Sequence, residues 1–157
     1  MNYGIAPGVA LYFVLGGIEG VVLGLFFTTF TISRLVFFTL NKDEGDPEYF
    51  NGAPSTIGGL VTLCSVILFQ EHTAVMGLFV GLACALMVAF EMHYKHLGRA
   101  LSRHRRALLG APVYVLVLLL GMKLWGVAWP VSIILTANII YGLWPTISSF
   151  RRVIVKS

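Results

Sequence analysis

Long apolar tracts dominate this chain and limit what it can fold into. Crossing the hydrocarbon core of a bilayer takes about 20 consecutive apolar residues, with a range of roughly 17–25. Three tracts are long enough alone, two need their polar flanks, and a sixth is too short to cross by itself. The three long tracts are Ile18–Phe38, Ala74–Phe90 and Val127–Trp144. The two that need their flanks are Ile57–Phe69 and Leu108–Met122, and the short one is Ile5–Leu15. The sixth is expected to be either a half-helix or the end of a segment that begins outside this chain.

Composition supports a membrane protein over a water-soluble one. Hydrophobic residues make up 57% of the chain and charged residues 11%, against roughly 45–50% and about 25% in ordinary soluble domains. No tail or linker is long enough to form another domain, and no basic run or cleavage pattern after Met1 predicts a removable signal peptide. We therefore expect an all-α integral membrane protein, with residues 1–157 as a single transmembrane helical domain. It should be a helical bundle of about six transmembrane segments, the first one short.

The basic residues predict an orientation. If the tracts alternate across the bilayer, nearly all Lys and Arg residues fall on one side, in the loops at residues 39–55 and 93–107 and at the C-terminus. Lys- and Arg-rich loops stay on the cytoplasmic or matrix face. We expect a multi-pass protein of the bacterial inner membrane or the mitochondrial inner membrane. The net charge of +4 suits anionic lipid, and nucleic acid is not an expected partner because no folded basic domain is present.

Polar residues inside the tracts are candidate functional groups. Arg34 has two interpretations: it either extends to the lipid headgroups, or it faces the bundle and holds a phosphate with its planar fork of donors. Asn138 is expected to hydrogen-bond a neighbouring helix. Cys64 and Cys84 are expected to be buried thiols, with no disulfide or metal pairing.

Metal and haem sites are not expected. The spacing places no two of the four histidines near mid-bilayer on different helices, and no Cys/His zinc spacing occurs; the histidines are His72, His93, His96 and His104. The tryptophans lie near tract ends, as interfacial anchors do; they are Trp125, Trp129 and Trp144.

Small residues at a spacing of four predict close helix packing. Gly20 with Gly24, and Gly77 with Gly81, would each lie on one face of a helix and allow another backbone to approach. The very short connection Gln70–His72 predicts adjacent antiparallel helices.

Four segments, taken in order, resemble a known family. Asn2–Tyr12, Ser33–Asn41, Tyr49–Ser55 and Leu86–Tyr94 are similar to the S-F-G-V-A-P-A-x-x-L-Y, L-R-L-A-R-F-N, Y-F-x-G-L-P-S-P and L-M-V-S-x-I-R-Y stretches of the CDP-alcohol phosphatidyltransferase family. The similarity is to bacterial phosphatidylserine synthases, which are CDP-diacylglycerol-serine O-phosphatidyltransferases, in their C-terminal part from the third helix to the eighth. Their order and spacing carry the resemblance, because each match alone is short and apolar.

The departures from that family matter for function. Its metal motif, D-G-x-x-A-R followed by G-x-x-x-D-x-x-x-D, holds a divalent metal such as Mg or Mn against the CDP pyrophosphate. None of the seven acidic residues here reproduces it, so no catalytic residue, metal ligand or cofactor is expected. Phe37 and His93 also stand where the family's stretches have arginine.

The main interpretation is a non-catalytic, phosphatidyltransferase-like membrane subunit, a pseudoenzyme that binds phospholipid and packs with a membrane-protein partner or further copies in a larger complex. The alternative is a CDP-diacylglycerol-dependent phospholipid-synthesis enzyme whose catalytic motif lies upstream or on a separate chain. A small transporter or channel is a third class, but buried charge pairs and broken helices are lacking.

The family topology would bring a lipid phosphate to Arg34, Asn51, Ser55 and Tyr94. Ser55 is expected to cap the helix that follows Pro54 and to leave first-turn backbone donors directed at the anion.

Overall fold

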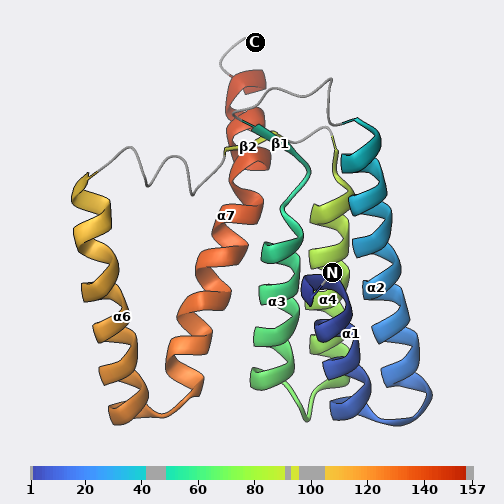
Figure 1. The fold of residues 1–157 in the computed structure, drawn as a ribbon, viewed down its shortest axis with the longest axis horizontal. Coiled ribbons are helices and arrows are strands. Elements are labelled where there is room, and N and C mark those ends of the chain that lie inside the picture. The colour runs from blue at the N-terminus through green and yellow to red at the C-terminus, as the bar shows by residue number, and fades with distance from the viewer. Residues whose placement is uncertain (1, 42–48, 91–92, 96–104, 155–157) are drawn as a thin grey trace.

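Six helices and one short pair of strands make up the part of the chain that the structure, a computed structural model, describes: residues 2–41, 49–90, 93–95 and 105–154 (Figure 1). The helices are α1 (Asn2–Leu15), α2 (Gly17–Leu40), α3 (Ser55–Leu68), α4 (Thr73–Val88), α6 (Arg105–Trp125) and α7 (Ala128–Ile154). The predicted helical class, the number of helices and the short first helix agree with this architecture.

Two of these helices are long and apolar enough to cross a membrane: Gly17–Leu40 and, within α7, Ala128–Pro145. The tract Ala74–Phe90 was expected to be a third. It is shorter because α4 ends at Val88 and the backbone leaves the helical region at Ala89, where ψ is 69°. At about 1.5 Å per residue, the 16 residues of α4 rise roughly 24 Å.

A glycine turn folds α1 back onto α2. Gly16 and Gly17 have φ values of 64° and 51°, a left-handed region that glycine adopts without a steric penalty. The two helices then approach closely, because a Cβ added at Gly24 would lie 2.6 Å from the carbonyl oxygen of Gly8. One added at Gly20 would lie 3.0 Å from the Cα of Tyr12. The predicted packing face at Gly20 and Gly24 is confirmed.

The second predicted glycine face is wrong. A Cβ added at Gly77 or Gly81 would meet nothing within 4 Å. The reason lies in the face that α4 buries: Met76, Val80 and Met87 form its fully covered stripe against the other helices, and the glycines lie beside that stripe.

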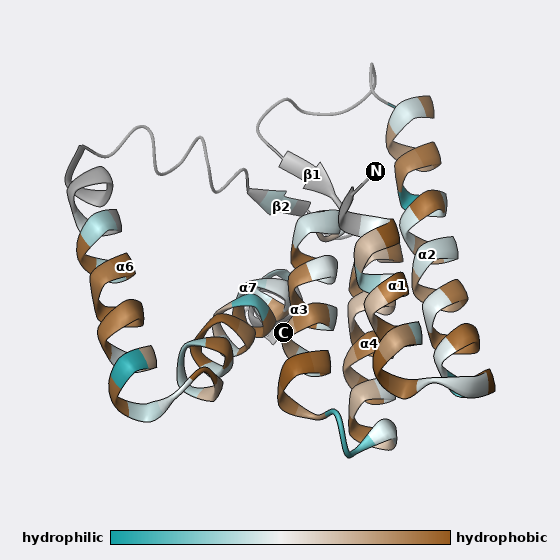
Figure 2. Cartoon of the chain, turned by 60° about the horizontal axis from the view of Figure 1, so that its bottom comes forward, coloured by the Kyte–Doolittle hydropathy of each residue, from teal (hydrophilic) through white to brown (hydrophobic). Residues whose placement is uncertain are grey.

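The core lies between α1, α2, α3 and α4, and α7 packs on the outer side of α3 (Figure 1). Its most completely buried side chains include Phe27, Val61 and Met76. Helix α6 stands at the edge and packs against α7, where Gly121 lies directly under the ring of Trp129. Most of its apolar side chains remain exposed, so α6 is hydrophobic along nearly its whole length on surfaces that no other described element covers (Figure 2).

The two short strands were not expected in an all-α protein. β1 (Tyr49–Asn51) and β2 (His93–Lys95) pair antiparallel, with Phe50 opposite Tyr94. They join the two segments that were expected to be loops on the same side. The end of α2, the start of α3, the end of α4 and the strand pair all lie at one end of the bundle, at the top of Figure 1. We call this the polar end.

Candidate functional site at the polar end of the bundle

Arg34 lies on the face of α2 that turns into the bundle. The buried residues of α2 are Gly20, Gly24, Phe27, Thr31 and Arg34, spaced alternately by four and three, so they form a single stripe. Arg34 is only 5% exposed. The sequence allowed Arg34 either to extend to the lipid headgroups or to face the bundle, and in the structure it faces the bundle.

Two contacts bracket Arg34, one between α2 and the last turn of α4 and one between α2 and Phe90 just beyond α4. One turn before it, the hydroxyl of Thr31 donates to the carbonyl of Phe27 at 3.0 Å and lies 4.0 Å from the sulfur of Met87. One turn after it, the ring of Phe37 stacks on Phe90 with centroids 3.8 Å apart and planes 15° from parallel. Arg34 is therefore buried between two contacts that join α2 to the C-terminal end of α4.

The Nε–H of Arg34 is buried without a hydrogen-bond partner among the described residues. The two acidic residues in those ranges, Glu19 and Glu71, are exposed. Glu19 is in the first turn of α2, and at about 1.5 Å per residue its Cα lies roughly 22 Å along the helix from that of Arg34. A buried cation without a counter-charge is costly, so this arrangement of the described residues favours an anion beside Arg34.

The start of α3 differs from the prediction by one residue. Pro54 occupies the N-cap position and Ser55 is the first helical residue, so no side chain caps the helix and the predicted Ser55 cap is wrong. The Pro54 carbonyl accepts from the N–H groups of Ile57 at 2.9 Å and Gly58 at 3.3 Å. Within the described ranges, no acceptor meets the N–H groups of Ser55 and Thr56, so these first-turn donors remain available.

Backbone contacts hold the entry to α3 against the end of α4. The Ala53 N–H donates to the carbonyl of Leu86 at 3.0 Å. Gly52 has a φ of 75°, and a Cβ there would lie 2.7 Å from the carbonyl oxygen of Met87. Glycine is required here by both the backbone conformation and the close approach. The last turn of α4 thus links the region of Arg34 to the start of α3.

Tyr94 fixes the strand pair to α7. It is 1% exposed, and its hydroxyl donates to the carbonyl of Gly142 at 2.7 Å. Burial, together with the neighbouring phenol of Tyr141, raises the pKa of Tyr94 to about 12. Since the single hydroxyl proton is donated to α7, Tyr94 has a positioning role in this arrangement. The backbone of Asn51 pairs with His93 in the strand pair, and its side chain lies outside what the structure describes.

Sequence analysis missed Met87 in α4 and Phe90 just beyond its end, which contact α2 one turn before and one turn after Arg34. Their apolar side chains carry no chemical signal, so only the tertiary arrangement identifies them. Asn138 also differs from expectation, because its side-chain amide donates to the carbonyl of Ile134 in its own helix at 2.7 Å.

Metal-ligating residues do not gather in the described ranges: no three His, Cys, Asp or Glu side chains lie close enough there to hold an ion. Cys64 and Cys84 are free and buried, as expected of thiols in apolar tracts. His96 and His104 lie outside the described residues.

Comparison with known proteins adds no relative: no family model matches the chain, and no curated protein matches it.

Proposed function

We propose that this chain is a non-catalytic membrane subunit that binds a phospholipid by its phosphate at the polar end and packs in a larger membrane complex. The observation that carries the proposal is Arg34, a buried cation whose Nε–H lacks a partner in the described residues. A phosphate suits that position because its oxygens accept the forked N–H donors of a guanidinium. The first-turn N–H groups of Ser55 and Thr56, which meet no acceptor in the described part of the chain, add further donors at the same end of the bundle.

The membrane setting is supported by α6. Five consecutive side chains, Val113–Val117, are apolar or aromatic and exposed, so they point in all directions around the helix. A helix that is hydrophobic all round needs an apolar environment, and among the described elements only α7 covers a side of α6. Hydrocarbon is the environment that satisfies the remaining surface, as it does for α2 and the apolar part of α7.

The proposed orientation places the polar end on the cytoplasmic face of a bacterial inner membrane or the matrix face of a mitochondrial inner membrane. The Lys- and Arg-rich connections carry that assignment. The exposed faces of α6 and α2 offer surfaces on which a partner membrane protein could pack, and the resemblance to phosphatidyltransferases agrees with a phospholipid ligand.

The absence of a carboxylate motif from the sequence favours a binding subunit over an enzyme. Phosphoryl transfer requires a metal cage that fixes and neutralises the pyrophosphate, and none of the seven acidic residues reproduces that motif.

Phospholipid retention tests the proposal. Wild type, Arg34→Lys, Arg34→Ala and the control Lys123→Ala are purified in one detergent, and co-purified phospholipid is quantified. Lys123 is an exposed cation on α6 and controls for loss of charge alone. A bidentate contact to phosphate contributes about 1.5–3 kcal/mol, so Arg34→Ala should weaken retention by roughly 10- to 100-fold.

Arg34→Lys should lie between wild type and Arg34→Ala, because lysine keeps the charge and loses the fork. Equal retention in all four proteins would overturn the proposal.

A further inference from the structure

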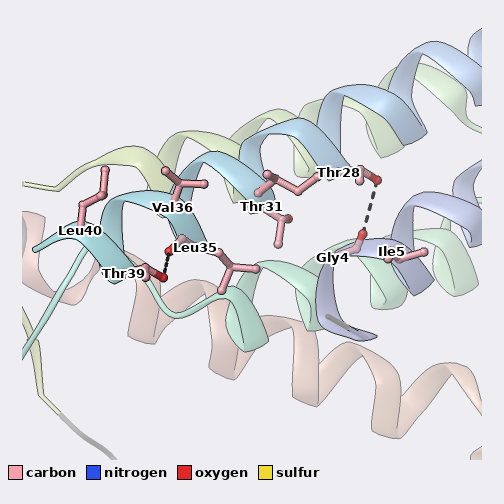
Figure 3. A pocket seen from close by; sticks show the side chains of 9 residues that line it. Gly4, Ile5, Thr28, Thr31, Leu35, Val36, Thr39 and Leu40 are labelled. Atoms are coloured by element: carbon pink, nitrogen blue, oxygen red, sulfur yellow. Dashed lines mark hydrogen bonds between the residues drawn. The ribbon is translucent and has the colours of Figure 1, made fainter. Parts of the chain in front are cut away.

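An apolar groove runs along α2 beside the start of α1. Its cavity volume is about 420 Å³, and it is lined by Gly4, Ile5, Thr28, Thr31, Ile32, Leu35, Val36, Thr39 and Leu40 (Figure 3). Gly4 and Ile5 lie beside Thr28 at one end of the groove, at the right of Figure 3, and Leu40, in the last turn of α2, marks the polar end at the left. We propose that this groove holds one acyl chain of a phospholipid from the leaflet at the polar end. The inference rests on the proposed function, since it requires the bundle to lie in a bilayer and take up lipid.

The chemistry of the groove wall favours hydrocarbon. Its only side-chain hydroxyls belong to three threonines, and each donates to a carbonyl of its own helix: Thr28 to Gly24 at 2.8 Å, Thr31 to Phe27 at 3.0 Å and Thr39 to Leu35 at 2.8 Å. Their donors are used, and the aliphatic side chains supply the remaining surface. A polar ligand would lose its hydrogen bonds to water on entering such a groove, whereas an alkyl chain loses none.

The length of the groove matches one leaflet. From Thr28 to Leu40, α2 rises roughly 18 Å at about 1.5 Å per residue. Half of a hydrocarbon core about 30 Å thick is about 15 Å. The groove therefore extends from the polar end to about the middle of the bilayer, which is the path of one acyl chain.

A polypeptide helix fits the same space poorly. Spread over roughly 18 Å, the volume gives a cross-section of about 23 Å² for the centres of water-sized atoms, or about 53 Å² once a radius of about 1.4 Å is added. A helix about 10 Å across has a cross-section of about 80 Å². Helix α1 also covers the rest of this face, where Gly8 lies against Gly24. Apolar atoms in contact lie about 4–4.5 Å apart, so an alkyl chain fits within the groove.

Photo-crosslinking tests the proposal. The purified full chain is reconstituted into vesicles of phosphatidylcholine and phosphatidylglycerol that contain a trace of phosphatidylglycerol with a diazirine halfway along one acyl chain, and labelled peptides are mapped by mass spectrometry. Label should concentrate on the groove residues Ile32 and Leu35 above the level on Val113–Leu120 of α6, which would contact bulk lipid only.

Leu35→Trp should reduce the groove label by roughly tenfold or more, the change expected when two or more methylenes lose their binding site. Leu119→Trp, a matched change at an exposed position on α6, should leave it unchanged. Label spread over α2 and α6 in proportion to exposure would overturn the proposal. The proposal would also be overturned if the groove residues were labelled in vesicles and not in native membranes, because a polypeptide would then occupy the groove in the native membrane.

The Arg34 variants separate the two proposals. Groove label that persists while Arg34→Ala retains lipid like wild type would leave the acyl-chain site standing without the phosphate site. Loss of phospholipid retention in Arg34→Ala, combined with label spread uniformly over α2 and α6, would support the phosphate site and overturn the acyl-chain site.

Discussion

Removing the hydroxyl of Tyr94 tests the contact that fastens the strand pair to α7. Tyr94→Phe keeps the ring and deletes the 2.7 Å hydrogen bond to the carbonyl of Gly142. A neutral hydrogen bond contributes about 0.5–1.5 kcal/mol net, and a buried acceptor left without any partner costs about 1–3 kcal/mol. Since α7 continues to Ile154, the Gly142 carbonyl keeps its intrahelical position, and we expect a loss of about 1 kcal/mol.

The assay is thermal unfolding in a single detergent at neutral pH. For a chain of this length, about 1 kcal/mol corresponds to a decrease in Tm of roughly 2–4 °C. Tyr114→Phe is the matched control, because Tyr114 is 49% exposed on α6 and its change should stay within about 0.5 kcal/mol. Equal Tm shifts in the two variants would refute the reasoning.

The same contact predicts a pH dependence. An unfolded tyrosine ionises near pH 10, whereas burial and the neighbouring Tyr141 raise the pKa of Tyr94 to about 12. The folded state therefore favours the neutral hydroxyl, so its contribution is complete below about pH 10 and is lost as the pH rises to about 12. The stability difference between wild type and Tyr94→Phe should shrink over that interval, and a difference that stays constant would contradict the assignment.

The remaining predictions concern packing, orientation and catalysis. Gly24→Ala should destabilise the chain by about 1–3 kcal/mol, because its Cβ would meet the Gly8 backbone. Gly77→Ala should be neutral or stabilise the chain by up to about 1 kcal/mol. Thermal unfolding compares the two variants, and equal effects would contradict the packing of α1 on α2. Cysteine introduced at residue 41 should react with an impermeant thiol reagent only from the cytoplasmic or matrix side, and cysteine at residue 71 only from the opposite side; labelling of both from one side would exclude the topology. The purified chain should not convert CDP-diacylglycerol and serine to phosphatidylserine, and turnover in the absence of a second subunit would favour the enzyme alternative.

Local patterns in the sequence predicted much of the architecture. The apolar tracts located the helices, and the four-residue spacing of Gly20 and Gly24 predicted the close packing of the first two. These features depend on neighbouring residues or on one helix face, so they can be recognised without the tertiary arrangement. The length of α4 was overestimated because Ala89 and Phe90 are apolar but lie beyond the helix end.

Non-local features could not be predicted in the same way. Tyr94 and Gly142 are 48 residues apart, and the strand pair has three residues on each side, too few for a periodic pattern. The spacing of Gly77 and Gly81 resembles that of Gly20 and Gly24, and only the packing of the neighbouring helices decides which pair is used. At the candidate site, Arg34 was identified from its type and place in an apolar tract, while its burial inside the bundle required the structure.

Lipid-dependent stabilisation tests the central claim most directly. Delipidated wild type and Arg34→Met are titrated with phosphatidylglycerol or phosphatidylcholine in one detergent, and Tm is recorded. Without lipid, Arg34→Met should be as stable as wild type or more stable, because it removes a buried charge whose Nε–H has no partner among the described residues. With saturating phosphatidylglycerol at 100 times its Kd, wild type should gain about 2.7 kcal/mol, corresponding to roughly 5–11 °C, and Arg34→Met should gain much less. Equal stabilisation of both proteins by phosphatidylglycerol, or a loss of stability in Arg34→Met before lipid is added, would contradict a phosphate site at Arg34.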